Sequence, residues 1–270
     1  MNVVYKPKGR ALEYAPFACN LYMGCTHGCT YCYAPGCVRR TTEDWHMEAS
    51  ARVNVIELFK KDAEWLSNNL PDDDKRRVLF CFLSDPYQPL ESRLHITRRC
   101  LEVAKEHGIR VDVLTKGTFA RVSKDFQLMH EAGVHLGVTL SFTTDKTRKE
   151  WEPNASPVSD RFKILKEAHD LGIFTWVSME PVIDPTEALG VIDKAHGYVD
   201  FWKVGKLNHN KEVEGAVDWH RFYLDVRAKL KYYKANFYIK KDLRAFARAK
   251  SFSKKKLKSQ PCGLASRAHE

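Results

Sequence analysis

Three cysteines lie within eight residues of one another, with the spacing C-x3-C-x2-C: Cys25, Cys29 and Cys32. Three thiolates leave one position of a four-coordinate metal site open, and an open position can bind a reactant. A [4Fe–4S] cluster held by three cysteines likewise has one iron available to a molecule from outside. Structural zinc sites more often supply four ligands, as two C-x2-C pairs or with histidines nearby. The spacing therefore favours an iron–sulfur site with an open coordination position.

A distorted zinc knuckle is a second interpretation, because His27 lies inside the cysteine run and Cys19 and Cys37 flank it. Cys100 falls in an amphipathic helical pattern and is expected in the core, whereas Cys262 is a free thiol, a hydrogen donor or a residue without a role. A disulfide framework is not expected, since the sequence begins without a long apolar segment. No apolar run approaches the roughly 18 residues of a membrane span. We therefore expect a soluble, cytoplasmic protein.

The net charge of +10 over 270 residues is concentrated near the C-terminal end. Residues 221–258 contain 14 Lys or Arg and two Asp or Glu, which gives +12 and leaves −2 for the rest of the chain. One interpretation is a surface that binds a polyanion such as nucleic acid, because aromatic residues alternate with the charges: Tyr232, Tyr233, Phe237, Tyr238, Phe246 and Phe252. The other is an amphipathic helix with solvated lysines and inward-packed aromatic rings.

Apolar runs typical of strands alternate with helical patterns along the chain. Strands are expected at residues 17–21, 78–83, 109–114, 134–142, 173–178 and 199–204, and helices at residues 53–68, 97–106, 124–132, 159–170, 186–195 and 218–231. A glycine separates a helix from the next strand at Gly108, Gly133 and Gly172, which is a common helix stop. This alternation indicates βα units around a mostly parallel sheet.

Six such units precede residue 210, fewer than the eight of a closed barrel. We predict an α/β fold in which residues 1–210 form a partial (β/α)6 TIM-type barrel and residues 211–270 form a basic helical C-terminal extension. In such barrels the chemistry gathers at the carboxyl ends of the strands. The polar groups expected at those ends are the cysteine loop, Ser84-Asp85, Thr115-Lys116, Ser141, Glu180 and the segment from Lys203 to Lys206.

The segment from Asn20 to Ala34, which holds the three cysteines with an aromatic residue before the third, resembles a known family. It is similar to the radical S-adenosylmethionine (radical SAM) superfamily, and more narrowly to its spore photoproduct lyase-like group. Further matches to that group are Ser84-Asp85-Pro86-Tyr87-Gln88-Pro89, Thr115-Lys116, and the turn Trp151-Glu152-Pro153 with Arg161. The similarity extends over about residues 17–207.

The resemblance implies a [4Fe–4S] cluster on Cys25, Cys29 and Cys32, whose remaining iron binds the amino and carboxylate groups of S-adenosylmethionine. One electron, from a donor such as a flavodoxin or ferredoxin, would cleave this cofactor to methionine and a 5′-deoxyadenosyl radical. The radical would abstract a hydrogen atom from a substrate. The protein must hold the cofactor still, neutralise its charges and exclude water.

The same resemblance assigns cofactor-binding roles to five residues. Ser84 and Asp85 would receive the ammonium group of S-adenosylmethionine, and Lys116 would balance its carboxylate. Ser141 would donate a hydrogen bond to the cofactor, and Tyr31 would pack on the adenine side of the cysteine loop. Two of these have plainer explanations in the sequence, because Asp85-Pro86 is typical of turns and Lys116 is equally well a solvated loop lysine.

One departure from the group concerns the final hydrogen donor. The photoproduct lyases carry a donor cysteine three residues before the aspartate, where this chain has Phe82. Cys81 lies one residue earlier, and a shift of one residue on a strand turns the side chain to the opposite face. Cys81 is therefore a weak catalytic candidate and is expected to be buried. Tyr33, which matches a radical-relay tyrosine of those lyases, is the other candidate. The resemblance thus implies the cofactor chemistry but not thymine-dimer repair.

Three functions remain open at the level of sequence. The first is a radical SAM enzyme that acts on nucleic acid or a nucleotide-like substrate, held by the basic segment 221–258. The second keeps the radical chemistry but takes a peptide or protein, although no further cysteine-rich cluster domain is apparent. The third is a nucleic-acid-binding protein with a structural metal site, which predicts a colourless zinc protein that does not cleave S-adenosylmethionine.

Overall fold

Eight strands form one sheet within residues 2–73, 76–208 and 210–248, which the computed structural model describes. Their order is β1-β2-β5-β6-β7-β8-β9-β10. Only β1 is antiparallel to its neighbour in this sheet. The strands are β1 Val4–Tyr5, β2 Phe17–Cys19, β5 Val78–Phe80, β6 Val111–Thr115, β7 His135–Thr139, β8 Phe174–Met179, β9 Phe201–Val204 and β10 Phe237–Ile239; β3 Tyr22–Met23 and β4 Ser50–Ala51 form a separate antiparallel pair.

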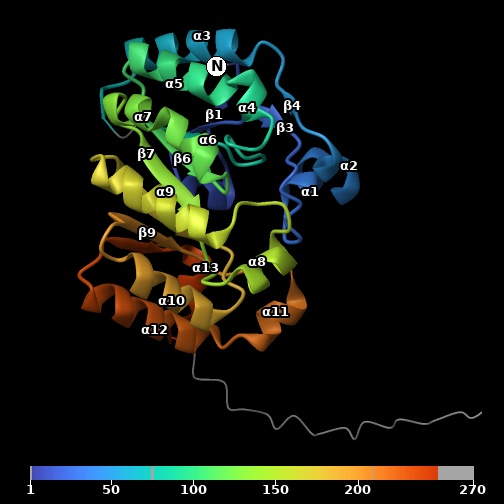
Figure 1. Ribbon diagram of the computed structural model, residues 1–270, viewed down its shortest axis with the longest axis vertical. Coiled ribbons are helices and arrows are strands. Elements are labelled where there is room, and N and C mark those ends of the chain that lie inside the picture. Colours follow the sequence, from blue (N-terminus) through green and yellow to red (C-terminus); the bar gives the residue numbers. More distant parts are fainter. Residues whose placement is uncertain (1, 74–75, 209, 249–270) are drawn as a thin grey trace, which may run out of the picture.

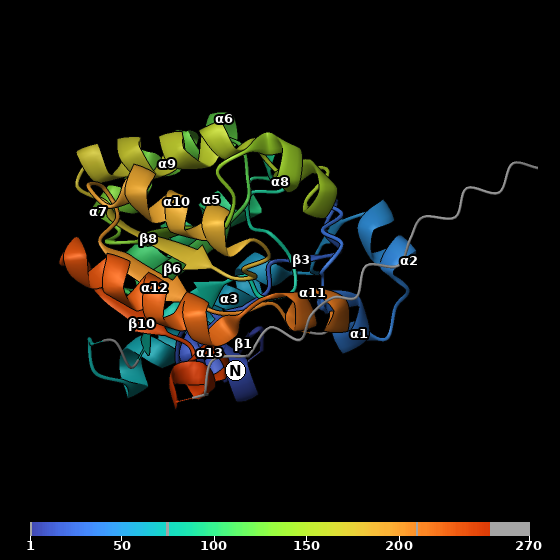
Figure 2. The same ribbon diagram turned by 90° about the horizontal axis from the view of Figure 1, so that it is seen from below.

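Helices connect the parallel strands and lie around the outside of the curved sheet (Figures 1 and 2). The longer ones are α3 Val55–Asn69, α5 Ile96–Glu106, α7 Phe126–Glu131, α9 Val158–Asp170, α10 Pro185–Ala195 and α12 Trp219–Tyr232. The shorter ones are α1 Ala34–Val38, α2 Thr42–Met47, α4 Glu91–Leu94, α6 Phe119–Val122, α8 Asp145–Trp151, α11 Lys211–Ala216 and α13 Lys241–Arg244, with 3-10 turns η1 Gly9–Glu13, η3 Ser123–Asp125 and η4 Ala245–Arg248. None of the helices described is long and apolar enough to cross a membrane.

The predicted α/β fold with a partial, open barrel is confirmed. Each of the six expected strands and six expected helices is present within a few residues of its expected bounds. Gly108, Gly133 and Gly172 have φ values of 61°, 59° and 77°, the left-handed conformation that glycine adopts without strain at the end of a helix. The expected helix–glycine–strand pattern therefore has a direct conformational cause.

The sheet contains one parallel strand that the sequence analysis did not predict. β10 lies in the segment expected to be helical, and Tyr238 pairs with Lys203 of β9. β1 and β10 are the two edges of the sheet, so the barrel is not closed. The division of the chain at residue 210 stays a prediction, but α12 and β10 extend the same βα pattern beyond it.

Two groups of buried apolar residues stabilise the fold. The larger group includes side chains from the sheet and from the helices that cover it. A smaller group consists of Ala15, Ala18, Leu79 and Trp176, with Tyr14 and Phe82 packed against it. Because side chains alternate between the two faces of a strand, this second group belongs to the inner face of the sheet, which lines the barrel interior.

Gly137 of β7 makes room for the indole of Trp176. A Cβ atom at this position would lie 2.2 Å from Trp176 Cε2, far inside van der Waals contact. We expect Gly137→Ala to reduce the free energy of unfolding by about 1–3 kcal/mol, because overpacking displaces a side chain that closely packed neighbours hold. Urea unfolding measures this change. Gly197→Ala, at a position with open space, is the matched control, and equal effects of the two changes would contradict the packing argument.

The connector between β1 and β2, residues 6–16, joins the two edges of the sheet. Arg10 forms an ion pair with Asp242 of α13, with 2.6 Å between Nε and Oδ2. Glu13 accepts hydrogen bonds from the Tyr238 hydroxyl at 2.7 Å and from the Lys241 backbone N–H at 2.9 Å. These contacts link a segment adjacent to β1 with β10 and α13, across the opening that the sheet leaves.

Candidate active site

The three cysteines lie on one loop that follows β3 and ends at α1. Cys25 and Cys29 are buried, Cys32 is half-buried, and all three are free thiols. Burial raises the pKa of each thiol, in Cys29 to about 11. The thiols are therefore protonated at neutral pH in the chain alone, and a bound metal must displace these protons.

The donor set suits a [4Fe–4S] cluster with one open iron, because it consists of three thiols and no fourth. Among the residues described, no three His, Cys, Asp or Glu side chains already converge as a metal-binding group. Cys25, Cys29 and Cys32 are the residues that would hold the cluster.

The turn after α8 fixes the backbone of the cysteine loop. Thr30 donates its N–H to the Trp151 carbonyl at 3.0 Å. Asn154 donates its backbone N–H to the His27 carbonyl at 3.1 Å and its side-chain Nδ2 to the Thr26 carbonyl at 3.2 Å. The Trp151–Asn154 region, which the sequence matched to the photoproduct lyase-like group, therefore holds the loop in place without using a cysteine side chain.

A buried ion pair joins this turn to helix α9. Arg161 Nη2 lies 2.5 Å from Glu152 Oε2, and the two side chains are 0% and 1% exposed. Burial by itself raises the pKa of Glu152, but Arg161 and Lys116 lower it below its usual value. Tyr31 donates its hydroxyl to Glu152 Oε1, and Lys116 Nζ lies 5.7 Å from the centre of the Tyr31 ring. The side chains of Tyr31, in the cysteine loop, and Lys116 are therefore neighbours.

Ser84 links the turn after β5 to the start of the cysteine loop. Its hydroxyl donates to the Gly24 carbonyl at 2.9 Å and accepts from Gln88 Nε2 at 3.0 Å. Gly24 has a φ of +79°, and a Cβ there would lie 2.1 Å from the Glu48 carbonyl oxygen. Only glycine fits this approach of two backbone segments. The expected role of Ser84 at the ammonium group stays a prediction.

Asp85 connects three strand ends and loops through its carboxylate. Oδ1 accepts from the Thr115 hydroxyl at 2.6 Å and from the Tyr87 N–H at 2.8 Å, and Oδ2 accepts from the Lys116 N–H at 2.6 Å. A carboxylate has about four acceptor positions, so these donors leave little capacity for a ligand. His27 Nδ1 lies 3.5 Å from Oδ2, but burial lowers the pKa of His27 to about 4. This contact is therefore not an ion pair at neutral pH.

Among the buried polar atoms of this site that have no hydrogen-bond partner within the described residues are Ser141 Oγ and His27 Nε2. Ser141 follows β7 and is 2% exposed. Leaving a buried hydroxyl unpaired is unfavourable, and a bound molecule with an acceptor or donor would satisfy it. Ser141 therefore fits the hydrogen-bonding role that the resemblance implies, and that role stays a prediction.

Tyr33 and Cys81, the two catalytic candidates from the sequence, lie in different surroundings. Tyr33 is 51% exposed, and its hydroxyl donates to the Phe82 carbonyl at 2.8 Å. Cys81 is buried in the larger core, where its sulfur accepts from the Leu21 N–H at 3.4 Å. Phe82 instead packs against Tyr14, with ring centres 5.7 Å apart. The thiol of Cys81 is thus on the helix side of the sheet, away from the interior.

Sequence reasoning missed a polar group inside the barrel. The Tyr14 hydroxyl lies 2.6 Å from Glu180 Oε2 and 2.9 Å from Ser178 Oγ, and Lys240 Nζ lies 2.5 Å from the same Glu180 oxygen. Glu180 had been noted only because it follows a strand. No local pattern marks Tyr14 or Lys240, which come from the connector and from the end of β10.

Lys203 of β9 carries a buried ammonium group in the same interior. It donates to the Tyr14 carbonyl at 3.3 Å and lies over the rings of Tyr14 and Trp176. Among the described residues, no carboxylate lies within ion-pair distance of it. Burial, reinforced by the nearby Lys240, lowers the pKa of Lys203 from 10.5 to about 8.

We expect Lys203→Met to raise the free energy of unfolding at pH 7 by an amount on the order of 1–3 kcal/mol. Below pH 8 both the folded and the unfolded chain carry the charge, so the folded state bears the full penalty. Between the folded pKa of about 8 and the unfolded value near 10.5, the unfolded chain binds more protons, so wild-type stability rises. The difference between variant and wild type should therefore shrink over this range. Chemical unfolding at several pH values checks this, with exposed Lys124→Met as control; a constant difference would contradict it.

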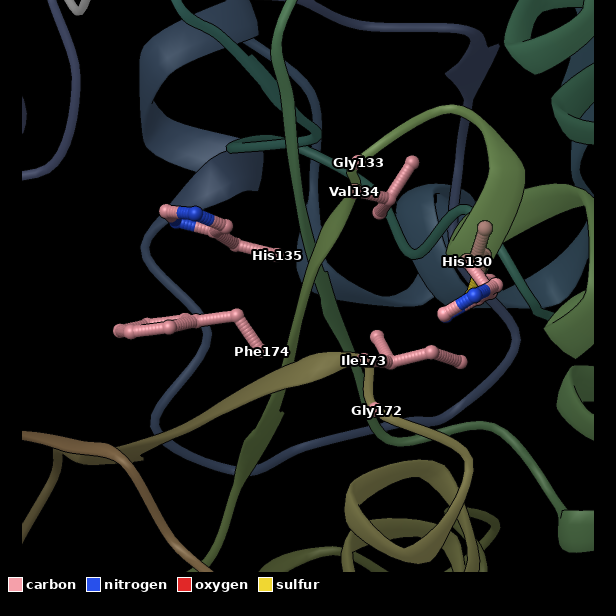
Figure 3. A pocket seen from close by; sticks show the side chains of 8 residues that line it. His130, Gly133, Val134, His135, Gly172, Ile173 and Phe174 are labelled. Atoms are coloured by element: carbon pink, nitrogen blue, oxygen red, sulfur yellow. The ribbon is translucent and has the colours of Figure 1, made fainter.

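A separate pocket lies at the amino-terminal ends of β7 and β8. It is lined by Met129, His130, Gly133, Val134, His135, Gly172, Ile173 and Phe174. Figure 3 shows the rings of His135 and Phe174 face to face, away from His130; the two ring centres are 4.1 Å apart. Because α/β barrels carry their chemistry at the opposite, carboxyl ends of the strands, this pocket is not part of the candidate site.

The basic segment 221–258 is described as far as residue 248, so Lys254, Lys255, Lys256, Lys258, Phe252 and Cys262 lie outside the described residues. Tyr232 is 80% exposed, but Tyr233 stacks on His196 with 3.8 Å between ring centres. Phe246 packs against the core, and the Tyr238 hydroxyl is bound to Glu13. Most of the described aromatic side chains of this segment therefore pack against the rest of the protein and are not exposed beside the Lys and Arg side chains.

Residues 19–193 match the radical SAM superfamily. The chain belongs to this superfamily. Radical SAM proteins use a [4Fe–4S] cluster and S-adenosylmethionine, and they need a source of electrons. An uncharacterized protein of Methanocaldococcus jannaschii is 25% identical over 203 residues, which cover 72% of this chain and 71% of that protein. An uncharacterized protein of Acidianus two-tailed virus is 27% identical over 185 residues, 63% of this chain and 57% of the relative.

Two solved radical SAM structures share this fold. Spore photoproduct lyase complexed with dinucleoside spore photoproduct aligns with a TM-score of 0.65 and 13% identity, covering 87% of this chain and 78% of that one. Streptococcus suis SuiB bound to S-adenosylmethionine aligns with a TM-score of 0.61 and 12% identity, covering 82% of this chain and 46% of that one. The chain thus spans less than half of SuiB, and both likenesses concern the fold alone.

Proposed function

We propose that this chain is a radical SAM enzyme that acts on nucleic acid or a nucleotide-like substrate. The observation that carries the proposal is the cysteine loop, held by the Trp151–Asn154 turn on a domain of the radical SAM superfamily. Cys25, Cys29 and Cys32 would hold the [4Fe–4S] cluster. When bound, this cluster supplies the electron that cleaves S-adenosylmethionine to methionine and a 5′-deoxyadenosyl radical.

The chain's own residues bind and orient the cofactor. Burial lowers the pKa of Lys116, but Cys29 in its thiolate form and the Glu152 carboxylate raise it above its usual value. The ammonium is thus retained next to the cluster loop, where it favours a carboxylate ligand. Ser141 brings a hydroxyl without a partner within the described residues, and the Ser84–Gly24 hydrogen bond keeps the β5 turn against the loop. Burial of these groups limits the access of water to a reactive species.

Two observations support a nucleic-acid substrate. Residues 221–258 carry a charge of +12, which suits phosphate contacts. The similarly folded spore photoproduct lyase has been solved with a dinucleoside photoproduct. A peptide substrate is the second candidate, because SuiB, which also shares the fold, has been solved with its precursor peptide SuiA.

The deciding experiment measures 5′-deoxyadenosine formed by anaerobically reconstituted protein with S-adenosylmethionine and dithionite. The reaction is run alone, with single-stranded DNA, with RNA, and with a mixed-sequence peptide library. Product that increases with nucleic acid supports the proposal. Product that increases only with peptides would move the substrate to the second candidate, and no product from protein with a full cluster would contradict radical SAM activity. A colourless zinc protein would instead support a structural metal site.

Replacing Lys254, Lys255, Lys256 and Lys258 with glutamine should weaken any binding of single-stranded DNA and flatten its dependence on salt. Each phosphate contact contributes about −0.7 to the slope of log K against log salt concentration for single strands. Loss of all four contacts should therefore reduce the slope by up to about 3 units. Fluorescence anisotropy at several salt concentrations measures this, with the four exposed lysines Lys60, Lys61, Lys124 and Lys146 replaced by glutamine as a control for net charge. An unchanged slope would show that these lysines do not contact the strand.

A further inference from the structure

Glu180 stands at the carboxyl end of β8, with its side chain held from three elements. Tyr14 of the connector donates to Oε2 at 2.6 Å, and Lys240, which follows β10, donates to the same atom at 2.5 Å. Ser178 contacts the Tyr14 hydroxyl at 2.9 Å. Gly205 lies directly against the carboxylate, since a Cβ there would be 2.7 Å from Oε1. The orientation of Glu180 is therefore determined before any ligand arrives.

The second carboxylate oxygen is available to a ligand. Both hydrogen bonds to Glu180 use Oε2, and Oε1 has no hydrogen-bond partner in the described part of the chain. The side chain is 18% exposed, whereas that of Lys240 is 4% exposed. A positioned carboxylate with one occupied and one accessible oxygen is an acceptor for a donor group of another molecule. Its negative charge is balanced by Lys240, so the site does not attract a further cation strongly.

Aromatic rings surround this acceptor. Tyr14 packs edge-on against Phe82, with an angle of 84° between the rings, and Tyr33 donates its hydroxyl to the Phe82 carbonyl. Phe82 thus contacts both Tyr33, at the end of the cysteine loop, and Tyr14, which is bound to Glu180, so the exposed phenol of Tyr33 lies on the side of the loop that leads to the carboxylate. A flat ring placed against Tyr33 would lie beside the cysteine loop, on the side where Phe82 and Tyr14 lead to Glu180.

We propose that Glu180 is a substrate-binding residue whose Oε1 accepts a hydrogen bond from the N–H edge of a nucleobase placed against Tyr33. Tyr14 is the positioning residue that orients this carboxylate. The inference rests on the proposed function and names which part of a nucleic acid is recognised. Aromatic faces and one hydrogen-bond acceptor suit a planar base, since stacking accepts any base and the acceptor selects for an N–H group. A phosphate is disfavoured at Oε1, because two anionic oxygens repel each other.

The test uses four single-stranded 12-mers: dT12, dC12, dA12 and an abasic 12-mer with the same phosphates. For each we measure the concentration that half-maximally stimulates 5′-deoxyadenosine formation, and the rate at saturation. Wild type should respond to at least one base-bearing strand about tenfold more strongly than to the abasic strand. Glu180→Gln should lose most of that difference, because Tyr14 and Lys240 would keep the amide oxygen at the position of Oε2, and the amide NH2, a donor, would then face the N–H edge of the base.

Tyr14→Phe is the second variant, since Glu180→Gln also removes the ion-pair partner of buried Lys240. Tyr14→Phe keeps the packing of the aromatic ring and the charge of Glu180, but it removes the hydroxyl that orients the carboxylate. The half-maximal concentration should rise about three- to tenfold, with the saturated rate changed less than twofold. Tyr238→Phe, which removes a tyrosine–carboxylate bond to Glu13, is the matched control and should leave the half-maximal concentration as in wild type. Thermal unfolding of every variant verifies that each is folded.

The outcomes separate this inference from the proposed function. No 5′-deoxyadenosine from wild type with a full cluster overturns both. Equal stimulation by the abasic and base-bearing strands overturns base recognition while the enzymatic activity stands. A wild-type response in both Glu180→Gln and Tyr14→Phe overturns the role of this carboxylate. Selective loss of the base-dependent response in the two variants, but not in Tyr238→Phe, supports it.

Discussion

Cys29→Ala is expected to abolish cluster binding and to reduce 5′-deoxyadenosine formation to the level of a reaction without protein. The variant has only two of the three thiolates that would hold the [4Fe–4S] cluster, and two are too few to retain it. The chain should stay folded, because the turn after α8 holds the cysteine loop through backbone atoms of Thr30 and His27 and the side chain and backbone of Asn154. Iron and sulfide per chain, visible absorbance and far-ultraviolet circular dichroism measure these effects.

Cys37→Ala is the matched control for this change. Cys37 is an exposed free thiol on α1, five residues beyond the triplet, and its replacement should leave iron content as in wild type. A Cys29→Ala protein with a full cluster would show that the triplet is not the ligand set. Equal loss in Cys37→Ala would add Cys37 to the ligands, and zinc in place of iron would favour the structural site.

Arg161→Met is expected to reduce the free energy of unfolding by about 3–5 kcal/mol. The change leaves the Glu152 carboxylate buried without its ion-pair partner, and both side chains are at most 1% exposed. Arg161 also donates to the Thr139 carbonyl at 3.0 Å and to the Ser156 carbonyl at 3.1 Å, so two more buried acceptors lose their donor. Guanidinium chloride unfolding measures the change. Because Glu152 anchors Tyr31, the variant should also retain less iron during gel filtration.

Lys163→Met is the matched control, because Lys163 lies on the same helix, α9, but forms an exposed ion pair. Lys163 and Glu167 lie 3.6 Å apart with side chains 53% and 46% exposed, and such surface pairs contribute little. The expected change is within about 0.5 kcal/mol. The double variant Glu152→Gln/Arg161→Met should recover part of the stability lost in Arg161→Met, since no unpaired charge is then buried. A loss below about 1 kcal/mol in Arg161→Met would contradict the argument.

The sequence predicted the parts of the fold whose signals are local. The run 78–83 and the glycines at 108, 133 and 172 depend on neighbouring residues, so strand and helix positions followed from periodicity and stops. β10 was missed because its three residues, Phe237 to Ile239, lie among lysines whose charge dominated the interpretation of that segment. Its pairing with β9 is a contact between distant segments, and no local pattern encodes it.

The residues of the candidate site likewise fall into those that a local sequence pattern predicted and those that only the folded chain brings together. The cysteine triplet is a spacing within one loop and was recognised directly. The pair between Glu152 and Arg161 was noticed as a family match, but its burial was not predictable, because that depends on how α8 and α9 pack. The bond between Tyr14 and Glu180 joins residues 166 positions apart. Neither residue belongs to a motif, so only the folded barrel brings them together.

The connector between β1 and β2 has a consequence for synthesis on the ribosome. Glu13 meets Tyr238 across 225 residues, which at about 5–20 residues per second are translated in roughly 10–45 s. Glu180 precedes Lys240 by 60 residues, so for about 3–12 s of that interval Glu180 lacks Lys240, and the inner face that carries Trp176 has no final strand beside it. The nascent chain is therefore expected to be a client of chaperones until its last described strand has emerged, and slow codons before residue 237 would prolong that exposure.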